Sequence, residues 1–303
     1  MWLLVSQIQG DDKMRQINTF SIVAKDQKTG EFGIAVQSKF LACASVVSWA
    51  KASAGAIATQ SFANLDYGEL GLKLLEKGYS AQKTLDALLA LDSDNNARQV
   101  GIVDKNGNAA AFTGKGCNSW AGHIVGESYC CQGNILAGEA VVKNISDSFL
   151  KNKDMPLPER LVEALSAGQE AGGDKRGMQA AGLLVVKEGG SYGGYNDRMI
   201  DLRVDDDPLP IEKLKDLLYM HRLYFGNTLP KDVKVVDKEI GLRIQTALTK
   251  KGFYSGEING LFDDSTQKAY ISYCGHDNFE ERLLSDGKID MAVIDYLEKS
   301  IIS

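Results

Sequence analysis

Three residues that a hairpin would bring together have side chains suited to nucleophilic chemistry. Residues 19–25 alternate apolar and polar side chains, and an apolar run at 32–36 ends in Gln-Ser-Lys. Because Gly30 lies in the turn between these segments, the pattern predicts an antiparallel hairpin that returns Ser38 and Lys39 beside Thr19. A hydroxyl beside an ammonium is an arrangement that activates a nucleophile. An ordinary hairpin with a solvated lysine fits the same pattern.

A glycine-flanked polar loop at residues 171–179 carries Asp174 and Arg176 directly before an apolar strand. Arginine is suited to carboxylate capture, so this pair is predicted to hold the charged ends of a substrate. The alternative is an internal ion pair that fixes the loop. The run Asp205 to Asp207 offers oxygen ligands for a hard cation, or it simply ends a strand.

Bulk composition excludes several classes of function. The 303 residues are 44% hydrophobic and 24% charged, as in soluble globular proteins, and the net charge of −6 argues against a nucleic-acid partner. The odd count of five cysteines predicts reduced thiols, and the three histidines lie too far apart to predict a metal site. We expect no cofactor, because the sequence has no phosphate-binding or dinucleotide motif. Neither a signal peptide nor a membrane-spanning run is recognised, so we expect a cytoplasmic protein without a membrane partner.

Strands and helices are predicted in blocks, which indicates an α+β fold of two packed sheets with helices outside. Residues 40–50 are predicted to form a buried strand or a tight strand–loop pair. Further strands are expected near residues 54–60, 98–103, 109–113, 123–126, 128–134, 180–186 and 199–204. Helices are expected near 64–77, 80–91, 138–152, from Pro158 onward, and at 210–225. A composition shift at 227–237 predicts a linker, so we expect a leader or tail at 1–18, one domain at 19–227 and a small domain at 238–303.

Residues 19–225 resemble a family of bacterial proteins that are Ntn-hydrolase-like but functionally uncharacterised. The resemblance rests on the segments 19–24 (TFSIVA), 37–40 (QSKF), 117–122 (CNSWAG), 132–136 (QGNIL), 172–177 (GGDKRG) and 192–208. It implies the four-layer αββα sandwich of the N-terminal-nucleophile hydrolases. In that superfamily the first residue of the mature chain attacks an amide, and its own α-amino group accepts the proton.

Carried onto this sequence, the resemblance implies that Thr19 is the nucleophile and that Lys39 assists it as a nearby charge. We further expect Ser38, Asn134, Asp174 and Arg176 to bind the substrate, which would be a small amide or peptide. Eighteen residues precede Thr19 in the sequence. The mechanism therefore requires that the peptide bond before Thr19 be cleaved.

The C-terminal segment is similar to peptidoglycan-binding-like modules of three helices. The similarity rests on residues 244–248 (IQTAL) and 252–263 (GFYSGEINGLFD), with Thr266 and Tyr270. It implies a peptidoglycan fragment as a partner. Two alternatives to a hydrolase stay open, namely a non-catalytic binding protein for a cell-wall fragment or amino-acid derivative, and a scaffold whose appendage mediates assembly. Apolar helices outside the sheets predict a homo-oligomer.

Overall fold

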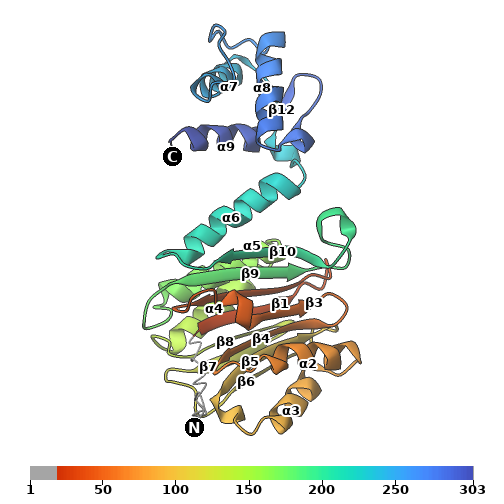
Figure 1. Ribbon diagram of the computed structural model, residues 1–303, viewed down its shortest axis with the longest axis vertical. Helices are drawn as coiled ribbons and strands as arrows, with labels where there is room; N and C mark the ends of the chain where they lie inside the picture. The colour runs from red at the N-terminus through yellow and green to blue at the C-terminus, as the bar shows by residue number, and fades with distance from the viewer. Residues whose placement is uncertain (1–18, 303) are drawn as a thin grey trace, which may run out of the picture. The chain divides into compact units, whose positions relative to one another are not determined.

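The computed structural model describes residues 19–302, which divide into two compact units. One unit ends at Leu218 and the other begins at Tyr219. The first unit combines two antiparallel sheets with helices (Figure 1). The prediction of an α+β fold is therefore confirmed.

The larger sheet has six strands in the order β10-β9-β2-β1-β8-β7. The strands are β1 (Thr19–Lys25), β2 (Phe32–Ser38), β7 (Gly122–Gly126), β8 (Tyr129–Gly133), β9 (Ala180–Val186) and β10 (Arg198–Val204). The predicted hairpin is confirmed, because β1 pairs with β2 in a register that sets Thr19 opposite Ser38. β8 lies on the other side of β1 and sets Phe20 opposite Gly133. β1 is thus an interior strand with its start surrounded on both sides.

The smaller sheet has four strands in the order β3-β4-β5-β6. They are β3 (Ser48–Lys51), β4 (Gly55–Ser61), β5 (Arg98–Asp104) and β6 (Ala109–Thr113). The segment 40–50 corrects our expectation of a buried strand or strand–loop pair. Residues 40–43 form a turn, the short helix α1 (Ala44–Val47) follows, and only the end of the segment belongs to a strand, β3. A helix of one turn carries too little periodicity to be recognised in a sequence.

Two helices cover each sheet on the side away from the other sheet. Helices α4 and α5 pack on β1, β2, β7, β8 and β9, while α2 and α3 pack on β3 to β6 (Figure 1). Their bounds are α2 (Asp66–Glu76), α3 (Ala81–Leu91), α4 (Glu139–Lys151) and α5 (Leu157–Glu170). The two sheets pack directly on each other, through β1 on β4 and β5 on β8 among other pairs.

Alternation along β1 divides its side chains between two cores. Phe20 and Ile22 belong to the cluster that packs under α4 and α5, whereas Val23 belongs to the cluster between the sheets. A third cluster lies between the smaller sheet and helices α2 and α3. Since successive strand residues point to opposite faces, Thr19 and Ser21 are directed into the same inter-sheet layer as Val23.

The second unit contains three helices and a small sheet. Its helices are α7 (Lys238–Lys250), α8 (Asp264–His276) and α9 (Met291–Ile302), and α6 (Pro210–Phe225) runs across the boundary between the units. β11 (Val233–Val235) pairs with β12 (Lys288–Asp290), so the segment 227–237 that we expected to be a linker contains a strand. Asp263 caps α8, because its side chain accepts a hydrogen bond from the backbone N–H of Thr266.

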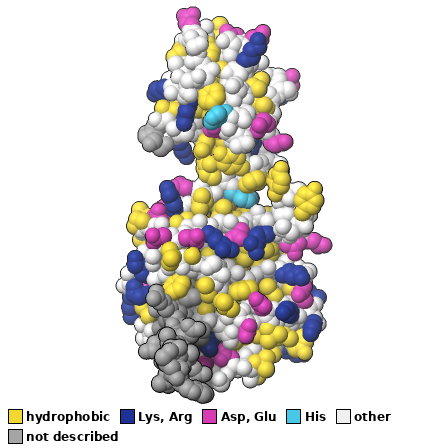
Figure 2. Space-filling view, viewed as in Figure 1, with side chains coloured by type: hydrophobic (Ala, Val, Ile, Leu, Met, Phe, Trp, Pro, Cys, Tyr) yellow, Lys and Arg dark blue, Asp and Glu magenta, His cyan; other side chains and the backbone are white. Residues whose placement is uncertain are grey.

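Short 3-10 turns complete the described chain. They are η1 (Asn95–Ala97), η2 (Tyr192–Gly194), η3 (Pro230–Asp232) and η4 (Glu280–Arg282). The expected leader or tail at residues 1–18 lies outside the described residues. No described helix has the length and apolarity needed to cross a bilayer. On the face drawn in Figure 2, Lys and Arg side chains are interspersed with Asp and Glu rather than gathered in one patch.

Candidate functional site

One end of the layer between the two sheets is polar and fully buried. Apolar side chains from both sheets fill the other end. The polar end is formed by residues of β1, β4, β5 and β8 and by the residue directly after β8. Its members are Thr19, Ser21, Gln60, Gln99, Gln132 and Asn134, each with no exposed surface. We call the five residues other than Thr19 the inter-sheet amide network.

Gln60 and Gln99 connect the two sheets at the level of Thr19. The Nε2 atom of Gln60 donates to the backbone carbonyl of Thr19 at 3.1 Å and to Oε1 of Gln99 at 2.9 Å. The same Gln99 oxygen accepts from Nδ2 of Asn134 at 2.8 Å. Buried amides that satisfy one another in this way fix the geometry of a core. The network thus sets the position of the Thr19 backbone relative to the smaller sheet.

Ser21 and Gln132 extend the network along the larger sheet. Oγ of Ser21 donates to Oε1 of Gln60 at 2.6 Å and accepts from Nε2 of Gln132 at 2.7 Å. Gly101 on the facing strand β5 makes room for this side chain, since a Cβ at that position would lie 2.2 Å from Oε1 of Gln132. The close approach of the two sheets at this point requires glycine.

Thr19 is held by its backbone while its hydroxyl makes no hydrogen bond. Its carbonyl accepts from the backbone N–H of Asn134 at 3.0 Å as well as from Gln60. Its Oγ1 atom is buried without a partner. Ser38 lies directly opposite on the same face of the sheet and is also fully buried. Cβ atoms of such cross-strand pairs are about 4.5–5.5 Å apart, so the two hydroxyls are neighbours.

Asn134 reaches the same place from the end of β8. Its Oδ1 atom is buried without a hydrogen-bond partner, although its Nδ2 atom is bound to Gln99. The next residue, Ile135, has a φ of 52°, which is unfavourable for a β-branched side chain. Its backbone is held there by an N–H hydrogen bond to the carbonyl of Asn118 at 3.0 Å. The unused acceptor of Asn134 and the unused hydroxyl of Thr19 belong to one polar layer.

Lys39 lies next to this layer but its ammonium is bound elsewhere. The Nζ atom donates to the backbone carbonyl of Met178 at 3.1 Å, and the side chain is exposed. Since Oγ1 of Thr19 has no partner, Nζ is not within hydrogen-bonding distance of it. The predicted hydroxyl–ammonium pair is therefore not formed in this structure.

Asp174 and Arg176 are brought together as an ion pair. The guanidinium donates to both carboxylate oxygens, at 3.0 Å from Nε to Oδ1 and 2.7 Å from Nη2 to Oδ2. The Asp174 side chain is fully buried and also accepts from the backbone N–H of Lys39 at 3.2 Å, whereas the Arg176 side chain is 35% exposed. Asp174 therefore fixes the loop and the end of β2, and Arg176 is the member of the pair that solvent reaches.

The other candidates from the sequence have structural roles among residues 19–302. Asp206 accepts from Gln179 Nε2, and Asp207 accepts from the backbone N–H of Leu209. No cluster of three or more His, Cys, Asp or Glu side chains in this range could hold a metal ion. Cys130 and Cys131 are buried, and burial raises the pKa of the Cys131 thiol to about 12.

Gln60, Gln99 and Gln132 were missed by sequence reasoning. Each is a polar residue near one end of a strand whose central residues are apolar or small. Alternation along one strand makes such a residue look solvent-facing, because the second sheet that buries it is distant in the sequence. The available signal was that three strands each carry a glutamine near one end.

In the second unit a buried glutamine holds a loop. Oε1 of Gln245 accepts from the backbone N–H groups of Asn259 and Gly260 at 3.0 and 2.8 Å. Its Nε2 atom donates to the carbonyl of Leu261 at 2.9 Å and to Oγ1 of Thr266 at 3.0 Å. Next to this core, α7 and α9 line a pocket of about 490 Å³ that includes Lys250.

Comparisons with known proteins match both units. Residues 19–214 match the model of a "Family of unknown function (DUF1028)", and residues 224–297 match the model of a "Putative peptidoglycan binding domain". A similar solved structure is the crystal structure of protein SPO2555 from Silicibacter pomeroyi, assigned to the DUF1028 family model. It is 29% identical with a TM-score of 0.62, over 69% of this chain and 91% of that chain. No curated protein matches the chain.

Proposed function

Because the chain belongs to the DUF1028 family of unknown function, followed by a peptidoglycan-binding-like domain, we propose a function from the site itself. The first unit is a four-layer αββα sandwich of the N-terminal-nucleophile hydrolase type, and it hydrolyses a small amide or peptide bond. The packing of α4 and α5 on one sheet, of α2 and α3 on the other, and of the sheets on each other supports this assignment.

The observation that carries the proposal is the state of Thr19. Its backbone carbonyl accepts two hydrogen bonds, while its buried hydroxyl accepts and donates none. Leaving a buried polar group unsatisfied costs about 1–3 kcal/mol. A threonine that is fixed in place with an unused hydroxyl, at the first position of the central strand, is suited to act as a nucleophile.

The chemistry proceeds once the peptide bond before Thr19 has been cleaved. The freed α-amino group then accepts the proton of the Thr19 hydroxyl as Oγ1 attacks the substrate carbonyl carbon. The carbon–nitrogen bond breaks, the proton passes to the leaving amine, and water hydrolyses the acyl-threonine. Thr19 is fully buried, so the site has to open before a substrate can reach the freed amine and the hydroxyl.

The remaining site residues receive the following roles in this proposal. Oδ1 of Asn134 accepts an N–H of the substrate, and Ser38 borders the nucleophile. Arg176 binds a substrate carboxylate, since it is the solvent-accessible member of its ion pair. Lys39 acts by its charge alone, after its Nζ atom has left the carbonyl of Met178.

A chain that begins at Thr19 tests the proposal. Release of primary amines from a panel of dipeptides and N-acyl amino acids is measured for this chain, for Thr19→Ser and for Thr19→Ala. We expect activity in the first two and a loss of at least about 10²-fold in the third, in line with the removal of a catalytic group. Undiminished activity of the Thr19→Ala chain would falsify the assignment of the nucleophile.

The second unit favours a second role, which is binding to peptidoglycan fragments. The pocket between α7 and α9 is lined by both Glu239 and Lys250, and peptidoglycan peptides carry free carboxylates and amines. Co-sedimentation of the full chain with insoluble peptidoglycan tests this role. We expect binding that weakens in Lys250→Glu and is retained in Lys268→Glu, an exposed site outside the pocket.

A further inference from the structure

A second pocket lies where the edge strands of the two sheets meet. It has a volume of about 500 Å³ and is bounded by the connection from the end of β6 to the start of β7. The residues of its lining that carry side chains with chemical function are Thr113, Lys115, Cys117, Ser119 and His123. None of them takes part in the mechanism proposed for Thr19.

A hydroxyl and an imidazole are in contact in this pocket. Oγ1 of Thr113 lies 2.8 Å from Nδ1 of His123 and accepts from Nε2 of Gln99 at 2.9 Å. The orientation of the Gln99 amide follows from two backbone carbonyls, of Gly133 at 2.8 Å and Gly122 at 3.2 Å, which can only accept. The hydroxyl of Thr113 can donate to Nδ1 when the ring proton of His123 is on Nε2, and this is the tautomer in which Nδ1 is a base.

The imidazole, although it is exposed on its strand, is a neutral base, and the neighbouring thiol is an inert group. Desolvation lowers the pKa of His123 below its usual 6.5, so the ring is uncharged at neutral pH. Desolvation also raises the pKa of the Cys117 thiol, whose Sγ atom donates to the carbonyl of Arg98 at 3.2 Å. A protonated, hydrogen-bonded thiol is a poor nucleophile. Thr113 is thus the candidate nucleophile of this pocket, because its hydroxyl lies in contact with a base, His123.

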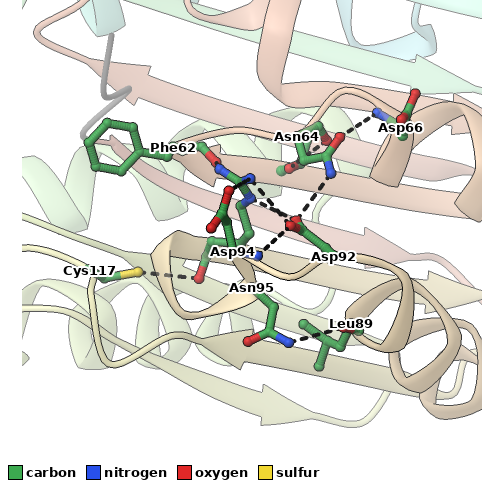
Figure 3. Close-up of polar contacts among 10 residues, drawn as sticks. Phe62, Asn64, Asp66, Leu89, Asp92, Asp94, Asn95 and Cys117 are labelled. Atoms are coloured by element: carbon green, nitrogen blue, oxygen red, sulfur yellow. Dashed lines mark hydrogen bonds and ion pairs between the residues drawn. The ribbon is translucent and has the colours of Figure 1, made fainter. Parts of the chain in front are cut away.

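A buried ion pair anchors Arg98, the residue to which the loop after β6 is hydrogen-bonded (Figure 3). Nε of Arg98 lies 2.8 Å from Oδ2 of Asp92, and the side chains are only 6% and 8% exposed. The Arg98 carbonyl accepts from the backbone N–H of Gly114 at 2.9 Å in addition to Cys117. The loop after β6 is therefore attached to a rigid part of the smaller sheet.

We propose that Thr113 and His123 form a second acyl-transfer site, which takes small esters or thioesters. Oγ1 of Thr113 attacks the carbonyl carbon while Nδ1 of His123 accepts its proton. The bond to the alcohol or thiol then breaks, the leaving group takes that proton, and water hydrolyses the acyl-threonine with His123 again as the base. No carboxylate of the described residues pairs with His123, so the site is assigned to acyl groups with better leaving groups than an amide.

This site does not depend on cleavage before Thr19, so an experiment can disprove either proposal without affecting the other. Hydrolysis of p-nitrophenyl acetate by the full chain, with all 303 residues, is the test. We expect Thr113→Val and His123→Gln to lose at least about 10²-fold of the rate, as when a general base or its nucleophile is removed. Thr113→Ser retains the activity. His276→Gln, which alters an exposed histidine of the second unit, leaves the rate unchanged.

Two further readouts separate catalysis from a structural role. The rate rises with pH and levels off, with a midpoint below 6.5 that is the same in Thr113→Ser. Mass spectrometry after rapid quenching places the acetyl group on the peptide containing Thr113. A wild-type rate in folded His123→Gln, or acetylation confined to lysines, overturns the proposal. Because His123 is exposed on its strand, this variant is expected to fold even if Thr113→Val does not.

Discussion

The side chain of Gln60 crosses from one sheet to the other and donates a hydrogen bond to the backbone carbonyl of Thr19 at 3.1 Å. Gln60 is the penultimate residue of strand β4 and Thr19 is the first residue of strand β1, so the bond joins the ends of two strands in different sheets. The contact places the candidate nucleophile against the smaller sheet through the backbone and leaves its hydroxyl free of hydrogen bonds. Rigid backbone with an unused side chain is what a preorganised nucleophile requires.

Replacing Gln99 by leucine is predicted to destabilise the first unit strongly. The change removes the acceptor that Nε2 of Gln60 and Nδ2 of Asn134 share, and only Gln60 keeps another acceptor, the Thr19 carbonyl. An unsatisfied buried group costs about 1–3 kcal/mol. Urea denaturation followed by tryptophan fluorescence reports on this unit, since Trp2, Trp49 and Trp120 all precede Leu218. Gln82→Leu, at an exposed position of α3, is the matched control and should change stability by less than about 0.5 kcal/mol. Equal stability of the two variants would contradict the role of the network.

Removing the Asp92 carboxylate is predicted to cost about 3–5 kcal/mol of unfolding free energy at neutral pH, because the buried charge of Arg98 would keep only its long contact with the exposed Asp94, at 3.9 Å. Asp147→Ala removes an exposed helix pair with Lys143 and should cost only about 0.3–0.5 kcal/mol. Similar losses of unfolding free energy in both variants would show that the Arg98–Asp92 pair stabilises the fold no more than an exposed ion pair does.

The stabilisation by Asp92 is predicted to disappear in acid. Burial alone would raise the pKa of Asp92, but hydrogen bonds from Arg98 and Asn64 outweigh it and lower the pKa to about 2. Since the folded-state pKa lies below the reference value of 3.8, the contribution is complete above that pH and is lost as the pH falls toward 2. The difference in urea midpoint between the wild type and Asp92→Ala should therefore shrink over this range. A constant difference would exclude the linkage.

In the second unit, Gln245→Leu is predicted to release the loop at residues 259–261. The backbone N–H groups of Asn259 and Gly260 lose their acceptor, so hydrogen exchange of peptides covering this loop should accelerate. Gln267→Leu removes only one exposed side-chain bond, to the carbonyl of Phe262, and should leave the exchange unchanged. Unaltered protection in Gln245→Leu would show that the loop is held by other contacts.

Local signals were sufficient for much of the fold. Strand β9 and helix α6 were predicted to the residue, because an uninterrupted apolar run marks a buried strand and Pro210 marks a helix start. The pairing of β11 with β12 was not predicted, since its partners are more than fifty residues apart and each strand has three residues. Short strands carry no periodicity that distinguishes them from a linker.

The candidate site was predictable only in part. The register that sets Thr19 opposite Ser38 follows from hairpin geometry, whereas the partners of Lys39 and Gln60 depend on segments that lie far away in the sequence. Lys39 meets Met178, and Gln60 meets Gln99, only through tertiary packing. Composition and spacing therefore predict the strand that carries the candidate nucleophile, but they do not predict which atoms Thr19 contacts.

The most direct test of the central claim is the site of acylation in a chain that begins at Thr19. The chain is quenched rapidly during turnover of p-nitrophenyl acetate, and its N-terminal peptide is weighed by mass spectrometry beside that of the Thr19→Ala chain. We predict an acetyl group on the Thr19 peptide in clear excess over the alanine control. Amide hydrolysis by the same chain with Thr19 no more acetylated than the control would contradict the claim.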